Sequence, residues 1–209
     1  MTALPLFIRK TISLAKLTLV TFGVALSSQV VIAETLQDQD LQVAETVLLY
    51  QRSSGGWPKN YDRKAKLSQK QRAAIVADRN KNDTMIDNGA THREIRLLAT
   101  AYRKTQDKRF REAALKGIDY LLQGQYQNGG WPQRFPEPQG YATHITFNDD
   151  AMIGVMSLLR DISDDQKTFS FVPEKTRLQC VEAVARGTTC ILKCQIKVNG
   201  KLTAWCAQH

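Results

Sequence analysis

Apolar residues recur at helical spacing in two successive stretches of the chain. Within each stretch they fall on stripes with intervals of three and four residues, the pattern of an amphipathic helix. No window shows a sustained alternation of apolar and polar residues, so an all-α fold is predicted. The stripes consist of Ile95, Leu98, Ala99 and Tyr102; Phe110, Ala113, Ala114, Ile118, Leu121 and Leu122; Met152, Val155, Met156 and Leu159; and Leu178, Val181, Ala185, Ile191 and Leu192.

A glycine-rich turn motif repeats along the chain. Gly-Gly-Trp-Pro occurs around Trp57 and again around Trp131, and a degenerate third copy contains Trp205, with 74 residues between successive tryptophans. A fixed period indicates stacked supersecondary units that bury one another's faces. Each unit would hold two antiparallel helices with long loops at one end, so we expect an α/α toroid or solenoid. A further short helix is expected over residues 68–80, opened by a capping pattern at Ser68.

The first 33 residues have the features of an export signal. Arg9, Lys10 and Lys16 precede or flank a short uncharged apolar stretch, and small residues lead up to Ala33. This order is typical of a secretory signal peptide, and the apolar run is too short to span a bilayer. We expect cleavage after Ala33, a secreted or periplasmic protein without a membrane anchor, and one partial toroid domain over residues 34–209. A buried core helix is the alternative for the apolar stretch.

The chain is basic, with a formal net charge of +9. Residues 1–33 hold three basic and no acidic residues, so their removal lowers the charge from +9 to +6. A basic exported protein favours a polyanionic partner through long-range attraction. No basic stripe or nucleic-acid motif is present, so nucleic acid is not the expected partner. We expect a monomer.

All four cysteines lie in the last third of the chain: Cys180, Cys190, Cys194 and Cys206. An oxidising compartment permits disulfides, and four cysteines allow three complete pairings that the sequence does not rank. Cys190 and Cys194 are four residues apart on a predicted helix and would share one face. The histidine spacing is poor for zinc, so structural cysteines are the expected interpretation.

Acidic and amide residues recur before the first helix of each predicted pair. Asp87 and Asn88 lie in the first such segment, and Asp149 lies in the second. Neighbouring repeats pack side by side, so these residues are expected to meet at one end of the fold. Their oxygen atoms are hard ligands that suit calcium. Helix capping is the alternative explanation, since Asp and Asn are common at helix starts.

The residues that follow the repeated turn are candidates for ligand binding. Trp57 either packs between helices or offers its ring as a platform for a sugar. Lys59 follows the turn and belongs to no helical stripe, although an exposed lysine is by default a solvated charge. Both residues are therefore kept as candidates, with packing favoured for Trp57.

An ordered series of motifs resembles polysaccharide lyase family ten, the toroidal pectate lyases. The first motif is Gly55-Gly56-Trp57-Pro58-Lys59-Asn60-Tyr61, and the resemblance covers essentially all of residues 34–209. The further matching segments are 86–91, 94–96, 117–122, 125–126, 128–133, 144–152, 198–202 and 205–209.

This resemblance implies a calcium-dependent β-elimination on polygalacturonate. A base removes the proton at C5 and the glycosidic oxygen leaves from C4, while calcium neutralises the uronate carboxylate. The resemblance places the calcium and catalytic site at Asp87, Asn88 and Asp149. It places substrate contacts at Lys59 and Asn60, beside Trp57.

One departure from the family pattern concerns the base. The resemblance implies an arginine base shortly after the Trp-Cys-x-Gln-His segment, and this sequence stops at His209. We therefore expect a fragment, a premature stop or a decayed copy, with fragment favoured because a third repeat would otherwise leave an apolar face uncapped. Arg93 and Arg134 are conceivable substitutes, but no spacing argument supports either.

Two competing functions are compatible with parts of the sequence. The Gln-x-x-x-Gly-x-Trp pattern at Gln51 and Gln125 also fits the repeat of triterpene cyclases, another α/α architecture. Those enzymes are far longer and richer in aromatic residues than this chain, which is 8% aromatic. The second competitor is a protein that binds acidic polysaccharide without cleaving it.

Overall fold

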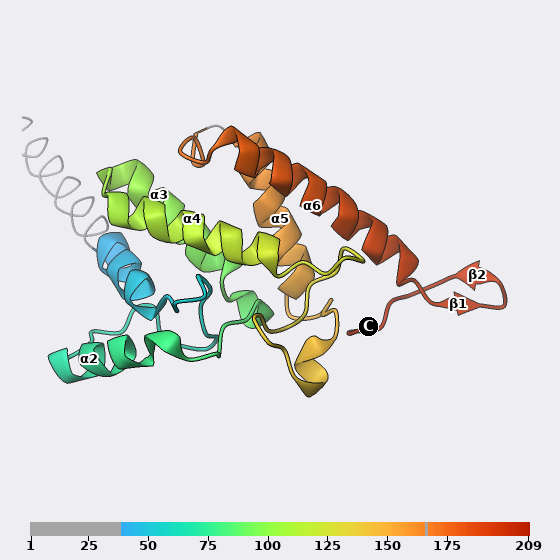
Figure 1. Ribbon diagram of the computed structural model, residues 1–209, viewed down its shortest axis with the longest axis horizontal. Helices are drawn as coiled ribbons and strands as arrows, with labels where there is room; N and C mark the ends of the chain where they lie inside the picture. The colour runs from blue at the N-terminus through green and yellow to red at the C-terminus, as the bar shows by residue number, and fades with distance from the viewer. Residues whose placement is uncertain (1–38, 166) are drawn as a thin grey trace, which may run out of the picture. The chain divides into compact units, whose positions relative to one another are not determined.

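The computed structural model describes residues 39–165 and 167–209, and the fold is mainly helical (Figure 1). The chain divides into two units, Met1–Leu41 and Gln42–His209, and the account below concerns the second. The predicted signal peptide and its cleavage site after Ala33 lie outside the described residues. Residues 39–50 are helical. The further elements are α2 (Gln69–Ala77), η1 (Asp78–Asn80), η2 (Asp87–Gly89), α3 (His92–Thr105), α4 (Lys108–Gln123), η3 (Gly140–Thr143), α5 (Ala151–Asp164), α6 (Glu174–Lys193), β1 (Lys197–Val198) and β2 (Lys201–Leu202).

The four long helices form two packed pairs, α3 with α4 and α5 with α6. The α3–α4 connection is short because Gln106 adopts a left-handed conformation that ends α3, and the Asp107 side chain then caps α4. Such a connection reverses the chain, so the two helices run antiparallel (Figure 1). The predicted helix pairs and the all-α fold class are therefore confirmed. Closure into a toroid remains a prediction.

The turn before each Trp-Pro sequence requires glycine. Gly55 and Gly129 have φ angles of +99° and +91°, which side chains other than glycine rarely adopt. A Cβ atom at Gly55 would lie 2.6 Å from the Lys116 carbonyl oxygen, and one at Gly129 would lie 2.3 Å from that of Arg186. Each turn thus packs directly on the backbone of the second helix of the following pair.

The three repeats share a hydrogen bond from tryptophan to the end of the preceding helix. In each case the indole N–H donates to a backbone carbonyl at 2.7 Å. Trp57 and Trp131 are buried, whereas Trp205 is 43% exposed. The degenerate third copy predicted from the sequence therefore keeps the contact of the first two. The donor and acceptor pairs are Trp57 and Val47, Trp131 and Leu121, and Trp205 and Ile191.

A repeated arrangement of glutamine side chains ties successive repeats together. Each of two glutamines donates one hydrogen bond to its own turn and one to the second helix of the next pair. These bonds satisfy carbonyl groups that the close packing would otherwise leave without partners. Gln51 Nε2 donates to the carbonyls of Gly55 and Ala113, both at 2.9 Å, and Gln125 Nε2 donates to those of Gly129 and Ala183, at 2.9 and 2.8 Å.

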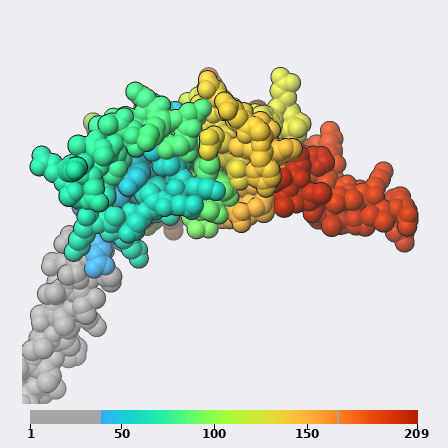
Figure 2. All heavy atoms as spheres, turned by 90° about the horizontal axis from the view of Figure 1, so that it is seen from below, coloured from blue at the N-terminus to red at the C-terminus, as the bar shows by residue number. Residues whose placement is uncertain are grey.

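The long loops are joined to one another by backbone hydrogen bonds. They lie at one end of the helix pairs, as predicted. Figure 2 shows this face, with the segment between Trp57 and α3 (cyan to green) beside the segment between α4 and α5 (yellow). The same bonds recur one repeat later and use residues near the end of the chain. They are Met85 N to Trp57 O (3.1 Å), Ile86 N to Gln133 O (3.0 Å), Thr146 N to Trp131 O (3.4 Å) and Phe147 N to Ala207 O (2.9 Å).

Two smaller elements differ in how well the sequence predicts them. Helix α2 begins after Ser68, and a capping box with Gln71 is formed as predicted. The hairpin of β1 and β2 was not predicted, although its turn residues Asn199 and Gly200 are a strong hairpin signal. Their φ angles of +50° and +77° suit a two-residue hairpin turn.

The cysteines are not paired in this structure. All four are free, and Cys206 is the exposed one. Cys190 and Cys194 share a face of α6 as predicted, with their Sγ atoms 3.9 Å apart. Among residues 39–165 and 167–209, no helix combines the length and apolar character that crossing a bilayer requires.

Candidate active site

Lys59 and Asp87 form an ion pair at the loop end of the first helix pair. The Lys59 ammonium donates a hydrogen bond to Asp87 Oδ2. The Asp87 side chain is 3% exposed, whereas that of Lys59 is 34% exposed. A buried carboxylate needs a charged or hydrogen-bonding partner, which Lys59 supplies while remaining accessible from solvent. The pair thus combines a fixed carboxylate with a cation that an anionic ligand can reach.

The asparagines that directly follow Lys59 and Asp87 in the sequence are also joined by a hydrogen bond. Asn88 Nδ2 donates to Asn60 Oδ1 at 3.2 Å, and the Asn88 backbone N–H donates to Asp87 Oδ1 at 2.9 Å. Both asparagines have positive φ angles, 63° at Asn60 and 53° at Asn88, a conformation that Asn tolerates better than most residues. The structure therefore brings four predicted site residues together.

Asp149 lies just before the start of α5. The turn η2, which contains Asp87 and Asn88, packs against α5, so the two predicted clusters are neighbours. Within the described chain, no hydrogen bond joins Asp149 to either residue. The neighbouring Asp150 does contact the first repeat, because its Oδ2 lies 3.4 Å from Arg93 Nη2.

The structure corrects the predicted role of Trp57 in substrate binding. Its side chain is completely buried, with the indole N–H bound to the Val47 carbonyl. Its backbone N–H donates to Thr91 Oγ1 at 3.1 Å. No face of the ring is open to a sugar, so Trp57 packs between helices, the alternative that the sequence favoured.

Three residues without a predicted role hold the Lys59 loop on α3. Tyr61 Oη and Arg63 Nε both donate to Glu94 Oε1, at 3.1 and 2.8 Å. The Tyr61 ring also stacks on Tyr50 with a centroid distance of 4.0 Å. Glu94 is completely buried, and its Oε2 has no hydrogen-bond partner in the described structure. Burial raises the pKa of Glu94, although the positive charge of Arg63 opposes this shift.

One signal for this cluster was present in the sequence. Glu94 precedes Leu98 by four residues, which places it on the apolar stripe of α3. A carboxylate on such a stripe indicates a buried partner, because charged side chains are rarely buried alone. Tyr61 and Arg63 lie on an irregular loop, where no periodic pattern identifies them.

His92 packs against the start of α5 and is 3% exposed. Its Nε2 has no hydrogen-bond partner and lies 3.8 Å from Asp150 Oδ2. Burial lowers the pKa of His92 to about 4, although the nearby Asp150 carboxylate opposes this shift. The ring lies close to Gly154, where a Cβ atom would be 2.4 Å from it. The imidazole is therefore neutral at pH 7.

The oxygen atoms at the site are of the kind that calcium binds. Asp87, Asn88 and Asp149 carry carboxylate and amide oxygens, which are hard ligands. The buried Asn148 Oδ1 has no hydrogen-bond partner among the described residues, so it can accept a further interaction. Within residues 39–165 and 167–209, no group of three or more His, Cys, Asp or Glu side chains is arranged to hold a metal ion. The donor atoms are thus of the chemical type that calcium prefers, and calcium binding stays a prediction.

The known proteins to which this chain is similar are pectic acid lyases and polysaccharide lyases. The model of the pectic acid lyase family matches residues 51–209. Two solved structures of a family 10 polysaccharide lyase from Cellvibrio cellulosa are similar, one of them a mutant in complex with trigalacturonic acid. Each is 35% identical, has a TM-score of 0.70, and is matched over 80% of this chain and 50% of its own. The chain thus spans about half the length of these proteins. No curated protein matches it.

Proposed function

The chain belongs to the pectic acid lyase family, and from this premise we propose that it cleaves polygalacturonate by calcium-assisted β-elimination. The products would be unsaturated oligogalacturonides. The observation that carries the proposal is the accessible Lys59 ammonium on the buried Asp87 carboxylate, with Asn60 and Asn88 paired beside it. This group offers a cation and amide donors to a uronate sugar at one end of the fold.

Lys59 and Asn60 are the proposed contacts to the substrate. An ammonium group attracts the uronate carboxylate, and the Asn60 amide can donate to a carboxylate or hydroxyl oxygen. The complex of the Cellvibrio lyase with trigalacturonic acid supports an acidic galacturonan as the ligand class. Asp87 fixes Lys59, because a buried carboxylate holds the ammonium in one place.

The reaction breaks the C4–O bond after loss of the C5 proton. The electron pair from C5–H forms the C4–C5 double bond, and the glycosidic oxygen leaves with the electrons of its bond to C4. Calcium, held by Asp87, Asn88 and Asp149, would supply positive charge that stabilises the charge developing next to the uronate carboxylate. Both oxygens of Asp87 already accept hydrogen bonds, from Lys59 and the Asn88 N–H, and the remaining lone pairs of the carboxylate would be the ones to bind calcium. We assign the base to none of the described residues.

The proposal places the protein outside the cytoplasm. This location follows from the export signal predicted in residues 1–33. It is also where the protein would encounter its polysaccharide substrate. The proposed partner is the polysaccharide itself, and the basic net charge, lowered from +9 to +6 by removal of residues 1–33, favours its approach.

The test is the ultraviolet absorbance of unsaturated product released from polygalacturonate. The full chain is compared in calcium and in chelator, and Lys59→Ala is compared with Lys64→Ala. Lys64 is an exposed lysine of the same loop whose side chain makes no contact at the site. A charge-assisted hydrogen bond is worth about 1.5–3 kcal/mol, so Lys59→Ala should lower product formation by about tenfold or more.

The outcomes separate the candidate functions. Calcium-dependent product that falls in Lys59→Ala and persists in Lys64→Ala supports the proposal. Calorimetric binding of trigalacturonate by a folded chain that gives no product would show a non-cleaving binder of acidic polysaccharide. Absence of both binding and product would overturn the assignment of the site.

A further inference from the structure

Much of the positive charge of the protein is concentrated in one segment, residues 66–81, here called the basic segment. In the sequence it follows Lys59 and precedes Asp87, the ion pair of the proposed active site. Five basic residues and one acidic residue give the basic segment a charge of +4, compared with +6 for residues 34–209 as a whole. A loop that begins and ends at the proposed site therefore carries most of the net charge.

Helix α2 forms the central part of the basic segment and has no buried residue. It lies apart from the two packed helix pairs (Figure 1). Its first turn is closed by the capping box between Ser68 and Gln71, and Val76 is 49% exposed. Most helices in proteins are stabilised by packing an apolar face, and α2 has no such face. The side chains of α2 are therefore available to a partner.

The loop that contains the basic segment is fastened to the rest of the fold on both sides. Before the segment, Arg63 forms an ion pair with the buried Glu94. After the segment, Asp83 accepts hydrogen bonds on both carboxylate oxygens from Arg52, at 2.7 and 2.8 Å. Such a bidentate pair fixes orientation as well as distance. The basic segment is thus held at the loop end of the first helix pair, where the proposed active site lies.

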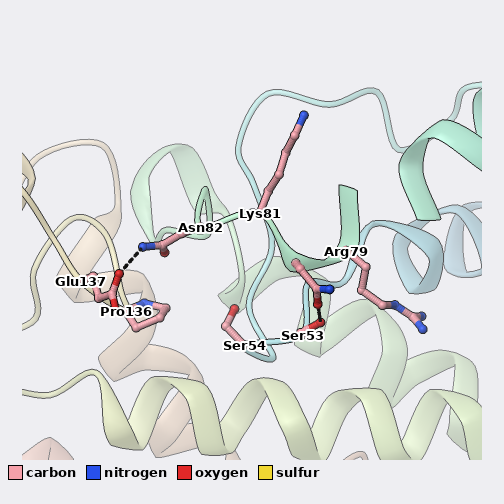
Figure 3. A pocket seen from close by; sticks show the side chains of 8 residues that line it. Ser53, Ser54, Arg79, Lys81, Asn82, Pro136 and Glu137 are labelled. Atoms are coloured by element: carbon pink, nitrogen blue, oxygen red, sulfur yellow. Dashed lines mark hydrogen bonds between the residues drawn. The ribbon is translucent and has the colours of Figure 1, made fainter. Parts of the chain in front are cut away.

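Four of the five cations in the basic segment have no carboxylate partner. Lys81 is the exception, because its ammonium lies 2.8 Å from Asp78. Figure 3 shows the Arg79 side chain running away from Glu137, the carboxylate of the neighbouring cavity. The charge of these cations is therefore not neutralised within the described part of the chain. The four side chains are exposed and form no ion pair or hydrogen bond with any other described residue: Lys66, Lys70, Arg72 and Arg79.

The arrangement of these cations suits an extended polyanion. Lys70 and Arg72 are two residues apart on a helix, so they point to different sides of it. The cations thus attract a charged chain through their combined field, with no single pocket for one group. The basic segment contains no aromatic residue, whereas proteins that bind single-stranded nucleic acid stack bases on aromatic rings. An acidic polysaccharide is the polyanion that these features favour.

We propose that the basic segment is a docking surface for the acidic polysaccharide and draws the polymer toward the site at Lys59 and Asp87. The inference rests on the proposed function for the identity of the polyanion. It adds a surface outside the group of residues proposed to contact the cleaved sugar. Attraction of this kind acts mainly on the rate of association and is weakened by salt.

The test is the binding of the full chain to immobilised polygalacturonate, measured by biolayer interferometry in the presence of calcium. The variant replaces three cations of the basic segment by glutamine: Lys66, Lys70 and Arg72. The matched control replaces three exposed lysines of α4 and α6 in the same way, with the same change in net charge: Lys108, Lys116 and Lys175.

The two triple variants should differ at low salt and agree at high salt. At about 0.1 M salt, the variant of the basic segment should show a Kd raised by about threefold to tenfold, mainly through slower association. The control should stay within about twofold of the wild-type Kd. At about 1 M salt the Debye length is about 3 Å, and the difference should disappear. Both variants should fold, because the replaced side chains are exposed and glutamine is a good helix former, and circular dichroism checks this.

Other results would overturn the proposal. Equal losses of affinity in the two triple variants would show an effect of total charge alone. A loss that persists at high salt would exclude electrostatic attraction. Tighter binding of the wild-type chain to duplex DNA than to polygalacturonate, lost in the variant of the basic segment, would assign the segment to nucleic acid.

The variant Lys59→Ala separates this proposal from the proposed function. If Lys59→Ala weakens binding and the variant of the basic segment does not, the docking surface is excluded and the proposed active site stands. If only the variant of the basic segment weakens binding, the docking surface stands and Lys59 is excluded as a substrate contact.

Discussion

At the residue scale, His92 couples the stability of the fold to pH. The side chain is buried beside Asp150 with a lowered pKa of about 4, while an unfolded histidine titrates near 6.5. The unfolded chain therefore binds a proton at a higher pH than the folded chain does. Stability from this group is fully present above about pH 6.5 and is lost as the pH falls toward 4.

We expect His92→Asn to flatten the pH dependence of unfolding. The shift of His92 corresponds to about 3 kcal/mol of stability lost on acidification, and this loss should be absent in the variant. The measurement is the free energy of urea unfolding at pH 7.5 and 4.5 for both proteins. His144→Asn, which changes an exposed histidine, is the control and should retain the wild-type difference. An unchanged difference in His92→Asn would contradict the assignment.

The site residues show what a sequence can and cannot reveal at this scale. Lys59, Asn60, Asp87 and Asn88 were predicted, and the structure pairs them, because short motifs directly after fixed turns are held by those turns. Trp57 was kept as a substrate candidate, although packing was favoured, because a motif does not state whether a ring is buried. The partners of Glu94 were missed because they reach α3 from an irregular loop, and only tertiary packing brings them there.

At the element scale, the repeated glycine turns set the distance between successive helix pairs. Gly129 combines a positive φ with close approach to the Arg186 carbonyl. Gly140 also has a positive φ, of 53°, but a Cβ atom there would meet no other atom within 4 Å, so it isolates the backbone preference alone. Substitutions at the two glycines therefore separate the free-energy cost of the backbone conformation from the free-energy cost of steric crowding.

We expect Gly129→Ala to destabilise the protein more than Gly140→Ala. A left-handed conformation costs an alanine about 1–2 kcal/mol, which applies to both variants. Displacing the Arg186 backbone should add about 1–3 kcal/mol to Gly129→Ala alone. Urea unfolding of both variants measures this difference. Equal losses of unfolding free energy in the two variants would show that the turn moves away from α6 at no cost in stability.

Helices were predicted more completely than strands. The stripes of α3, α4, α5 and α6 predict helices because burial repeats with the helical period, and α2 is marked by its cap at Ser68. The β1–β2 hairpin has only two residues in each strand, too few for an alternating pattern to appear. Its Asn199-Gly200 turn was the available signal, but it was considered only as part of the matching family segment 198–202.

At the scale of the whole molecule, the 74-residue period predicts how the helix pairs stack. The period appears in the structure as recurring contacts of tryptophan, glutamine and glycine, so the order of the units follows from the sequence. The relation between the Asp87 and Asp149 segments was predicted in outline. The acid that contacts Arg93 of the preceding repeat, Asp150, could not be chosen in advance, because adjacent acids at a helix start differ only in the direction their side chains take.

The three tryptophans are also intrinsic fluorescence probes, one in each repeat. Trp57 and Trp131 are shielded by the helices around them, while Trp205 is 43% exposed. Variants that keep one tryptophan and replace the others by Phe should therefore differ in fluorescence. The emission of Trp57 or Trp131 should be blue-shifted and protected from quenching by iodide. The emission of Trp205 should be red-shifted and quenched by iodide. Equal quenching of all three would contradict the packing described above. Because each indole is bonded to the helix before its turn, its fluorescence signals when that turn separates from its helix during unfolding.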